Sequence, residues 1–456
     1  MTTLSLETHN AMLDIAEPYL NDESIKSMQF FEYPPQTQAN NNTPSHSIRI
    51  EINSDAIYTL PSKSYISIEG QIRRAGNNAA YDAADEITLI NNAMMYLFDE
   101  INYKLNTTTI EQISNPGQTT SMIGYLSQPD DFSTSAGLKY CWSKDTNTTA
   151  NSTKYVGSVA APAAGYIPTE HPNFNQGFAT RKGFLFSSNP RGSFTFIIPL
   201  SHIFGFAEYK KVIYGVKHTL TLSRAADTQA LYRAAGVVDG KVDITNISWH
   251  MPQVEMNTEN LVNLMQYIEQ KVTIPIAFSA RSCETTEVSE NQNFNWRISV
   301  TGGAEKPRWI IIGFQTDKGN TQEQNPALFD HCNLTSAHVE LNSRSYPSTV
   351  LDIDFDKNKY TKLYDMFDDF KKEYYGIDSL VGGTQVNVPA FKTLFPILVF
   401  DVRKQNDELK KGVMDITAKF KFSRNIPANT TAYALIISDR VFKMSSDGKN
   451  MSVISM

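Results

Sequence analysis

The chain has 456 residues, a net charge of −7, and 41% hydrophobic against 20% charged residues, which is typical of a folded protein long enough for two large domains. The acidic balance, with a single lysine among the first 30 residues, disfavours a protein that grips nucleic acid electrostatically. The three cysteines, Cys141, Cys283 and Cys332, are far apart and predict no disulfide framework, which fits assembly in a reducing, intracellular place.

The first 44 residues are expected to form an N-terminal arm. Their start, MTTLSLETHN, lacks the basic and apolar regions of a signal peptide. The pattern from Ala11 to Glu17 predicts a short helix, which Pro18 would end. No run of about 18 apolar residues occurs anywhere, so we expect no transmembrane segment.

Strand patterns begin after the arm. Ile48, Ile50 and Ile52 alternate with polar residues, and period-two alternation predicts a half-buried strand. Further strands are predicted at 66–69, 94–105, 193–200, 212–223 and 242–251. Between them, 128–191 is rich in Ala, Thr, Gly and Pro, and so long a stretch within a compact domain predicts a surface excursion.

A second block of strands follows a predicted connecting helix at 257–270, where apolar residues recur at helical spacing after a capping polar residue. This second block, 271–456, contains another helix pattern at 358–375, with an apolar stripe on one side and charges on the other. Its strands are predicted at 271–281, 293–300, 308–316, 335–342, 395–402, 411–423 and 431–439.

The longest alternations lie at the end of each block. One inward-facing set is Val216, His218, Leu220 and Leu222, and the other is Met414, Ile416, Ala418, Phe420 and Phe422. Such patterns favour antiparallel strands with one solvated face. About eight strands in each block predict a mainly β protein built of two tandem eight-stranded jelly rolls, at 45–256 and 271–456.

Chemistry-bearing residues are scattered. Asp352, Asp354 and Asp356 alternate in a predicted strand, where calcium is conceivable, but the glycine and glutamate positions of an EF-hand are not met. A solvated strand face is therefore the favoured interpretation. On the helix at 358–375, spacings of three or four residues predict local ion pairs on a solvated face, formed by Asp365, Asp368, Asp369, Lys371 and Lys372.

Three other candidates are weaker. His331 beside Cys332 lacks the two further ligands that a zinc site needs. Cys141 beside Trp142 carries no signature of a thiol enzyme. A small basic and aromatic surface for nucleic acid is conceivable from Arg181, Lys182, Phe184, Phe186 and Arg191, although the acidic balance argues against it. We therefore predict no catalytic residue, no cofactor and no metal site.

Eight segments, taken in order, resemble one family. They are TLPSKSYISIEG (59–70), FDEINYKLN with NPG after it (98–117), IPLSHIFGFAEYKKVIYGVKHTLTLSR (198–224), SWHMPQV (248–254), EKPRWIIIGFQTD (305–317), FDHCNLTSAHVELNSRSYP (329–347), YTKLYDMFDDFKKEYYG (360–376) and IPANTTAYALIISDR (426–440). Together they resemble the double jelly-roll major capsid proteins of Polinton (Maverick) elements and adintovirus-like viruses. The resemblance spans roughly 45–440, and 128–191 is the part that it does not match.

The resemblance implies a structural protein of the virion, assembled inside the host cell. In this family each chain stands two jelly rolls upright, and a homotrimer forms a pseudo-hexameric capsomer that tiles an icosahedral DNA-virus shell. The implied partners are neighbouring capsomers, a penton and minor capsid proteins. Direct sequence-specific nucleic-acid binding is not implied, because a closed shell contains DNA by enclosure. The excursions at 128–191 and 358–375 would project as towers or lock neighbouring chains.

Two other classes of function remain open. A carbohydrate- or receptor-binding jelly-roll protein would need a concave row of aromatic residues, whereas Trp142, Trp249, Trp296 and Trp309 are scattered. A jelly-roll enzyme of the cupin or glycoside-hydrolase kind would need clustered His and Glu ligands or a carboxylate pair, and the sequence shows neither.

Overall fold

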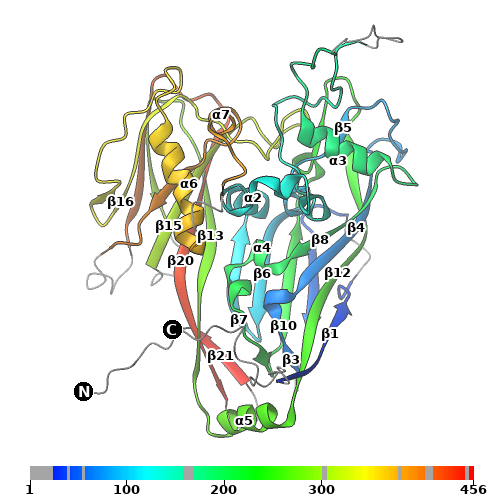
Figure 1. The fold of residues 1–456 in the computed structure, drawn as a ribbon, viewed down its shortest axis with the longest axis vertical. Helices are drawn as coiled ribbons and strands as arrows, with labels where there is room; N and C mark the ends of the chain where they lie inside the picture. The colour runs from blue at the N-terminus through cyan, green and yellow to red at the C-terminus, as the bar shows by residue number, and fades with distance from the viewer. Residues whose placement is uncertain are drawn as a thin grey trace, which may run out of the picture.

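The structure, a computed structural model, describes residues 24–37, 42–53, 57–157, 168–299, 306–377, 383–405, 414–446 and 451–455. Two β units stand side by side, the first on the right and the second on the left in Figure 1. Helix α5 (Thr258–Glu269) joins them at the lower end of the molecule, and the side chain of Asn257 caps it by accepting a hydrogen bond from the N–H of Asn260.

The first unit contains eight main strands in two facing sheets. They are β1 (Ile25–Tyr33), β2 (Ser47–Ile52), β4 (Tyr65–Arg74), β6 (Phe98–Leu105), β7 (Thr108–Ser114), β8 (Ser193–Pro199), β10 (His218–Arg224) and β12 (Gly240–Met256). One sheet has the order β1-β12-β4-β8 and the other β2-β10-β6-β7. Short strands add to this frame, namely β3 (Tyr58–Thr59), β9 (Ile213–Tyr214), and the pair β5 (Ile87–Leu89) and β11 (Leu231–Arg233).

The second unit repeats this plan. Its strands are β13 (Ile274–Glu287), β14 (Asn293–Ile298), β15 (Lys306–Thr316), β16 (Leu334–Leu341), β17 (Arg344–Tyr346), β18 (Leu398–Asp401), β19 (Ile416–Phe422) and β20 (Thr430–Ser446), with β21 (Met451–Ser455) added beside β20. The sheets have the orders β13-β20-β15-β18 and β14-β19-β16-β17. In both units the main strands are thus ordered first-eighth-third-sixth and second-seventh-fourth-fifth. The prediction of two tandem eight-stranded jelly rolls is confirmed.

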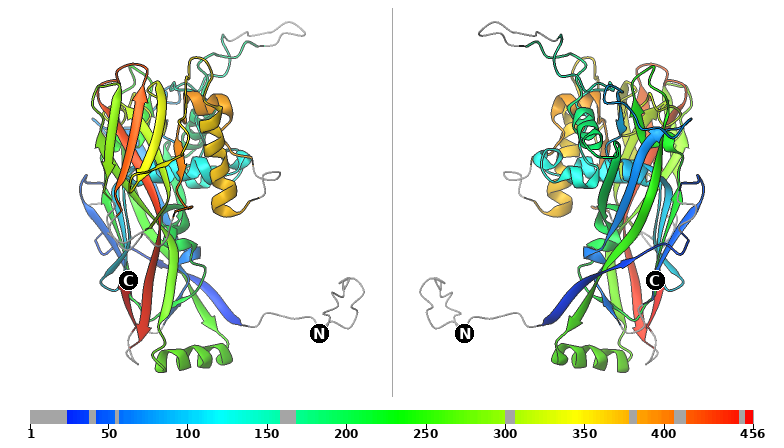
Figure 2. Two further views of the ribbon diagram at one scale, coloured as in Figure 1. Left: turned by 90° about the vertical axis from the view of Figure 1, so that its left-hand side faces the viewer. Right: turned by 90° about the vertical axis from the view of Figure 1, so that its right-hand side faces the viewer.

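Helices fill the connections between strands. They are α1 (Ala93–Tyr96), α2 (Pro116–Ser127), α3 (Gln176–Phe186), α4 (Leu200–Ile203), α6 (Thr361–Tyr375) and α7 (Val388–Thr393), with 3-10 turns η2 (Pro61–Lys63), η3 (Asp130–Ser133), η4 (Gly137–Tyr140), η5 (Gly205–Glu208) and η6 (Asp227–Gln229). Each unit has its longest excursion between its fifth and sixth main strands, which carries α2 and α3 in the first unit and α6 and α7 in the second. Figure 2 shows these helices on one side of the sheets, and α2 contacts α6.

Each unit has its own apolar core between its sheets. Leu220 and Leu222 of β10 are fully buried in the first core, and Phe420 of β19 lies in the second, as their alternation predicted. The second core also takes in Met122 of α2 and Trp142, which belong to the first unit's excursion. The two units are therefore interlocked through this excursion.

The prediction of an N-terminal arm at 1–44 is wrong for residues 24–37, which the structure describes. Ile25–Tyr33 forms β1, the first main strand, with Phe31 opposite Met251 and Tyr33 opposite Trp249 of β12. The predicted helix from Ala11 to Glu17 lies outside the described residues. Strand β1 showed no alternation because it is an edge strand whose side chains are mostly exposed on both faces.

Three predicted strands, at 94–105, at 212–223 and around 352–356, differ from the observed elements, while the others overlap their predicted ranges. The range 94–105 begins with helix α1, since a buried single helical turn and a buried strand have the same apolar pattern. The range 212–223 contains a break at Gly215, whose φ is +65°. The chain there passes from β9, in one sheet, to β10, in the other.

Substituting Phe420 tests the inward face of β19. Its ring is 1% exposed, and its centroid lies 5.9 Å from that of Phe294 and 5.2 Å from that of Phe314. Phe420→Asp removes this packing and buries a charge, so we expect a loss of at least about 3–5 kcal/mol and no soluble folded chain. Lys421→Asp, on the exposed face, is the control and should melt like the wild type. Normal melting of soluble Phe420→Asp would contradict the strand facing.

Candidate functional site

The predicted acidic clusters do not form a metal site. Within the described ranges, no group of three or more His, Cys, Asp or Glu side chains could hold a metal ion. Asp354 forms an ion pair with Lys357 at 2.8 Å, and Asp352 pairs with Lys359. The segment 352–356 is not a strand, so the predicted common strand face is wrong: an isolated bridge between Asp354 and Lys359 closes a tight turn there.

The charged face of α6 is smaller than predicted. Lys372 forms the expected ion pairs with Asp368 at 2.6 Å and Asp369 at 3.3 Å. Lys371 is only 4% exposed and donates to the carbonyl of Gly383 at 3.3 Å, so its placement on the solvated face was wrong. The burial of the Lys371 ammonium group lowers its pKa.

The cysteines are buried, unpaired thiols. Desolvation raises the pKa of Cys141, Cys283 and Cys332 to about 12, which makes each of them a poor nucleophile at neutral pH. The ring of His331 stacks on Phe355 with centroids 4.3 Å apart. These contacts are structural ones.

The basic surface for nucleic acid that the sequence made conceivable, and that its acidic balance disfavoured, does not form around Arg181 and Lys182. Arg181 is 1% exposed and forms an ion pair at 2.8 Å with Asp145, which is also buried. Lys182 is 7% exposed and pairs with Glu86 at 3.0 Å. Both cations are therefore neutralised within the first unit and are not available to a nucleic acid at the surface.

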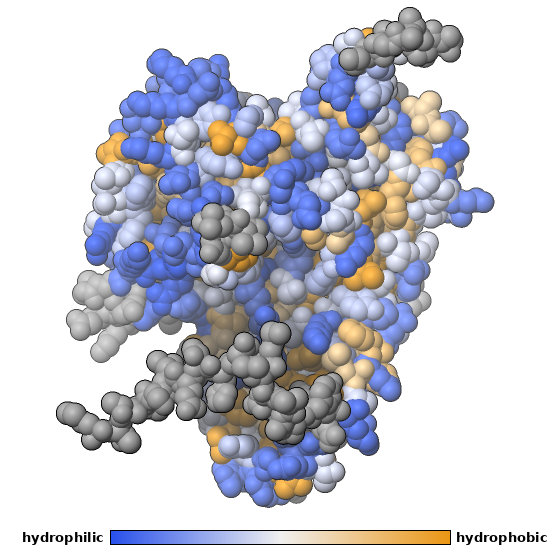
Figure 3. Space-filling model, in the orientation of Figure 1, coloured by the Kyte–Doolittle hydropathy of each residue, from blue (hydrophilic) through white to orange (hydrophobic). Residues whose placement is uncertain are grey.

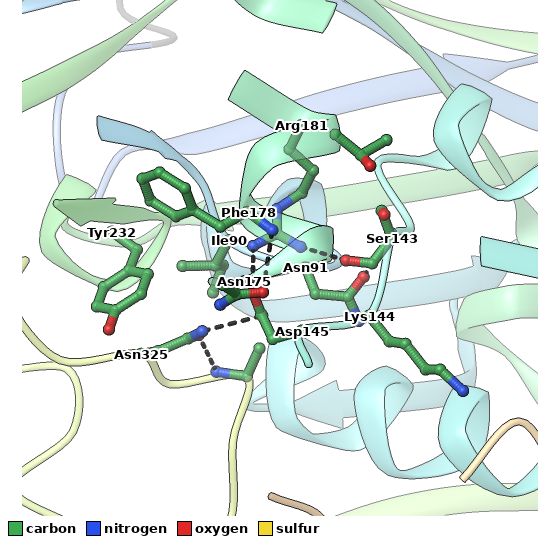
Figure 4. A network of polar contacts seen from close by, with 12 residues as sticks. Ile90, Asn91, Ser143, Lys144, Asp145, Asn175, Phe178, Arg181, Tyr232 and Asn325 are labelled. Atoms are coloured by element: carbon green, nitrogen blue, oxygen red, sulfur yellow. Dashed lines mark hydrogen bonds and ion pairs between the residues drawn. The ribbon is translucent and has the colours of Figure 1, made fainter. Parts of the chain in front are cut away.

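Asp145 is the centre of a polar network inside the excursion (Figure 4). Its carboxylate accepts hydrogen bonds from Arg181 at 2.8 Å, from Asn175 at 2.9 Å and from Asn325 at 3.0 Å. Asn325 lies between β15 and β16, so the network joins the two units. The prediction of a surface excursion at 128–191 is wrong for this part, because a fully satisfied buried network fixes it in place.

A second polar contact lies where the units meet, between the edge strand β7 of the first and the edge strand β13 of the second. Glu111 of β7 is fully buried and accepts hydrogen bonds from the backbone N–H groups of Gly205 (3.1 Å), Phe206 (2.9 Å) and Arg281 (2.6 Å). Burial raises the pKa of its carboxyl group to about 7 despite these donors.

Arg281 of β13 completes this contact from the other side. Its guanidinium group donates to the carbonyls of Ser201, His202 and Ile203 at 3.0–3.3 Å, around helix α4. It also forms an ion pair with Glu208 at 2.8 Å, and the hydroxyl of Tyr374 donates to the same carboxylate. The terminal guanidinium nitrogens of Arg281 and the hydroxyl of Tyr374, both from the second unit, thus meet acceptors at fixed places on the first.

The two backbones approach closely at the same place. A Cβ atom added to Gly205 would lie 1.8 Å from the carbonyl oxygen of Ser279, so only glycine fits there. Further along, Arg440 of β20 donates to the carbonyl of Ile110 at 2.6 Å. We call this set of contacts between β7 and β13 the internal seam. Sequence reasoning missed it because Glu111 and Arg281 lie 170 residues apart and match no motif.

Two other observations bear on function. Trp142, Trp249, Trp296 and Trp309 are all buried, with exposures of 8% or less, so they form no aromatic row for a glycan. Among the described residues, no helix combines the length and apolar character needed to cross a membrane.

Comparisons with known proteins agree with the observed topology. The double jelly roll-like domain family matches residues 146–442. The Faustovirus major capsid protein is 10% identical, with a TM-score of 0.53 over 98% of this chain and 93% of that chain. A chain in the structure of the Sputnik virophage is 9% identical, with a TM-score of 0.56 over 98% and 92%. Curated proteins give no sequence match. At such identities the two structures show a shared fold.

Glu111 offers a test of the internal seam. Glu111→Ala would leave three buried N–H groups without an acceptor, so we expect a loss of about 3 kcal/mol or more in the free energy of unfolding. Gln112→Ala, at the neighbouring exposed position of β7, is the matched control and should cost less than about 1 kcal/mol. Chemical denaturation measures both. Equal, small losses would show that the seam does not depend on this carboxylate.

Acid should destabilise the fold through its buried histidines. His218 lies between the hydroxyls of Tyr103 (2.7 Å) and Thr59 (2.9 Å), and burial lowers the pKa of His218 to about 3. Between pH 3 and 6.5 the unfolded chain therefore binds more protons at this residue than the folded chain does. The contribution of His218 to the free energy of unfolding is thus fully present above pH 6.5 and is lost as the pH falls. Between pH 7 and pH 5 the melting temperature should fall less for His218→Gln than for the wild type. An equal fall would refute this assignment.

Proposed function

Because this chain belongs to the double jelly roll-like domain family, we propose that it is the major capsid protein of an icosahedral DNA-virus shell and assembles as a homotrimer. The observation that carries the proposal is the repetition of one jelly-roll strand order in two units held side by side by a buried polar seam. Three such chains would supply six barrels, which gives a pseudo-hexameric capsomer from a three-fold oligomer.

The structural neighbours support this role. One is named as a major capsid protein, of Faustovirus, and another is a chain in the structure of the Sputnik virophage. Because the eight sequence segments resemble the Polinton (Maverick) and adintovirus-like major capsid proteins, we propose that the chain is of that type. The proposed location is the virion, and the proposed partners are neighbouring capsomers, a penton and minor capsid proteins.

The proposal assigns no catalytic residue, cofactor or metal. Of the charged groups described above, Glu111 and Arg181 are buried and internally paired and Asp354 lies in an exposed ion pair, while the three thiols are buried. The acidic chain would retain DNA by enclosing it. The helical excursions, which lie on one side of the sheets, are proposed to project from the capsomer or to lock neighbouring chains (Figure 2).

Mass photometry and light scattering on the purified chain test this proposal. We expect a stable species of three times 51.2 kDa, and negative-stain images with a hexagonal outline or closed shells. A chain that stays at 51.2 kDa at every accessible concentration, with no tendency to assemble, would contradict the capsid function.

A further inference from the structure

The internal seam uses two particular sheet edges. It brings the fifth main strand of the first unit, β7, against the first main strand of the second unit, β13. The N–H of Arg281 on β13 donates to Glu111 on β7, and Arg440 beside β13 donates to the carbonyl of Ile110. The seam is therefore a directional contact between a fifth-strand edge and a first-strand edge.

Each unit has one edge of the same kind that the internal seam does not use. The first unit's first strand is β1, and the second unit's fifth strand is β17. Within the described part of the chain, β1 pairs only with β12, and β17 pairs only with β16. Figure 1 shows β1 at the outer edge of the right-hand unit and β16 toward the outer edge of the left-hand unit, while β7 and β13 lie near the middle.

Strand β1 exposes several large apolar side chains, whereas an edge strand that faces only solvent is normally polar. It carries four large exposed apolar side chains within nine residues, namely Ile25 (49%), Met28 (38%), Phe30 (47%) and Phe31 (42%). The equivalent strand β13 has Ile276 and Ala280 at 1% and 2% exposure. On the face seen in Figure 3, hydrophobic residues gather at several places on the right-hand unit. An exposed apolar edge strand of this kind indicates a contact with another chain.

The edge at β17 complements strand β1 in apolar exposure and in charge. Val350, four residues after β17, is 83% exposed, which makes it an apolar side chain directed to solvent. Arg344 of β17 and Glu32 of β1 are both exposed and carry opposite charges, while the other charged residue of β1, Lys26, already pairs with Glu255 at 2.6 Å. Apolar contact with opposite charges at its margin is the usual composition of a protein interface.

We propose that β1 of one copy packs against β17 and residues 347–350 of the next copy, as the intermolecular equivalent of the internal seam. This rests on the proposed homotrimer and names the surface that forms it. Because the contact joins two different edges, it is heterologous, and it closes a ring when the rotation between neighbours is regular. Three internal seams and three such contacts would then alternate around six barrels.

Charged substitutions on the two edges test the proposal. Met28→Glu/Phe31→Glu changes β1, and Val350→Glu changes the edge at β17. All three side chains are at least 38% exposed, so each variant should melt like the wild type. We expect the loss of the trimer in mass photometry at concentrations where the wild type is trimeric, with at least a tenfold higher concentration needed to restore it. Val238→Glu, at a 57% exposed position of the first unit away from both edges, is the control and should remain trimeric.

Cross-linking gives a second, independent readout. Ser27→Cys on β1 and Ser345→Cys on β17 would be treated with a bismaleimide, and the wild type is the control because its three cysteines are buried. Since the two edges lie on opposite sides of one chain, we expect covalent dimers and trimers in the double variant and neither in the single variants. A wild-type trimer whose edge variants stay trimeric, without cross-links, would overturn the proposed contact between β1 and β17 and leave the proposed function standing. A wild type that never forms a trimer would overturn both.

Discussion

The buried contact between Glu111 and Arg281 sets the relative orientation of the two jelly rolls. A carboxylate and a guanidinium group lose their hydration there, which is costly unless each finds partners. Glu111 accepts three backbone N–H groups, and Arg281 donates to three carbonyls and to Glu208. Polar contacts of this kind are satisfied in one geometry only, whereas apolar surfaces tolerate sliding. A fixed angle between barrels is what a closed ring of barrels requires.

The helical excursions stabilise the same orientation at another place. Met122 and Trp142 come from the first unit but lie in the core of the second, and the Asp145 carboxylate accepts from Asn325 across the boundary. Apolar burial and a buried polar network therefore act together there. The chain is best understood as two similar barrels that are interlocked, with the excursions on one side of the sheets and the connecting helix α5 at the lower end.

The sequence predicted strands well where one face is buried and the other solvated. In β10 and β19 the inward positions Leu222 and Phe420 are buried, and their neighbours are polar. Strand β1 was missed because a sheet edge exposes both faces, so that nothing selects for alternation. The burial of Arg181, which the sequence left as part of a conceivable but disfavoured basic surface, could not be predicted because its partner, Asp145, lies 36 residues earlier and the pairing depends on the tertiary fold.

The internal seam was likewise missed because its contacts depend on the tertiary fold. Glu111 is flanked on β7 by Ile110 and Gln112, and its burial comes from a strand 170 residues later in the chain. Family resemblance supplied the expectation of a trimer, but the edges that would form it became visible only when both units were seen to share one strand order.

A cryo-EM reconstruction of the purified oligomer would show directly how the barrels of neighbouring copies meet. We expect three copies around a three-fold axis, with six barrels in a ring and β1 of each copy beside β17 of the next. An assembly of another symmetry, or a three-fold assembly in which β1 faces solvent, would contradict this arrangement.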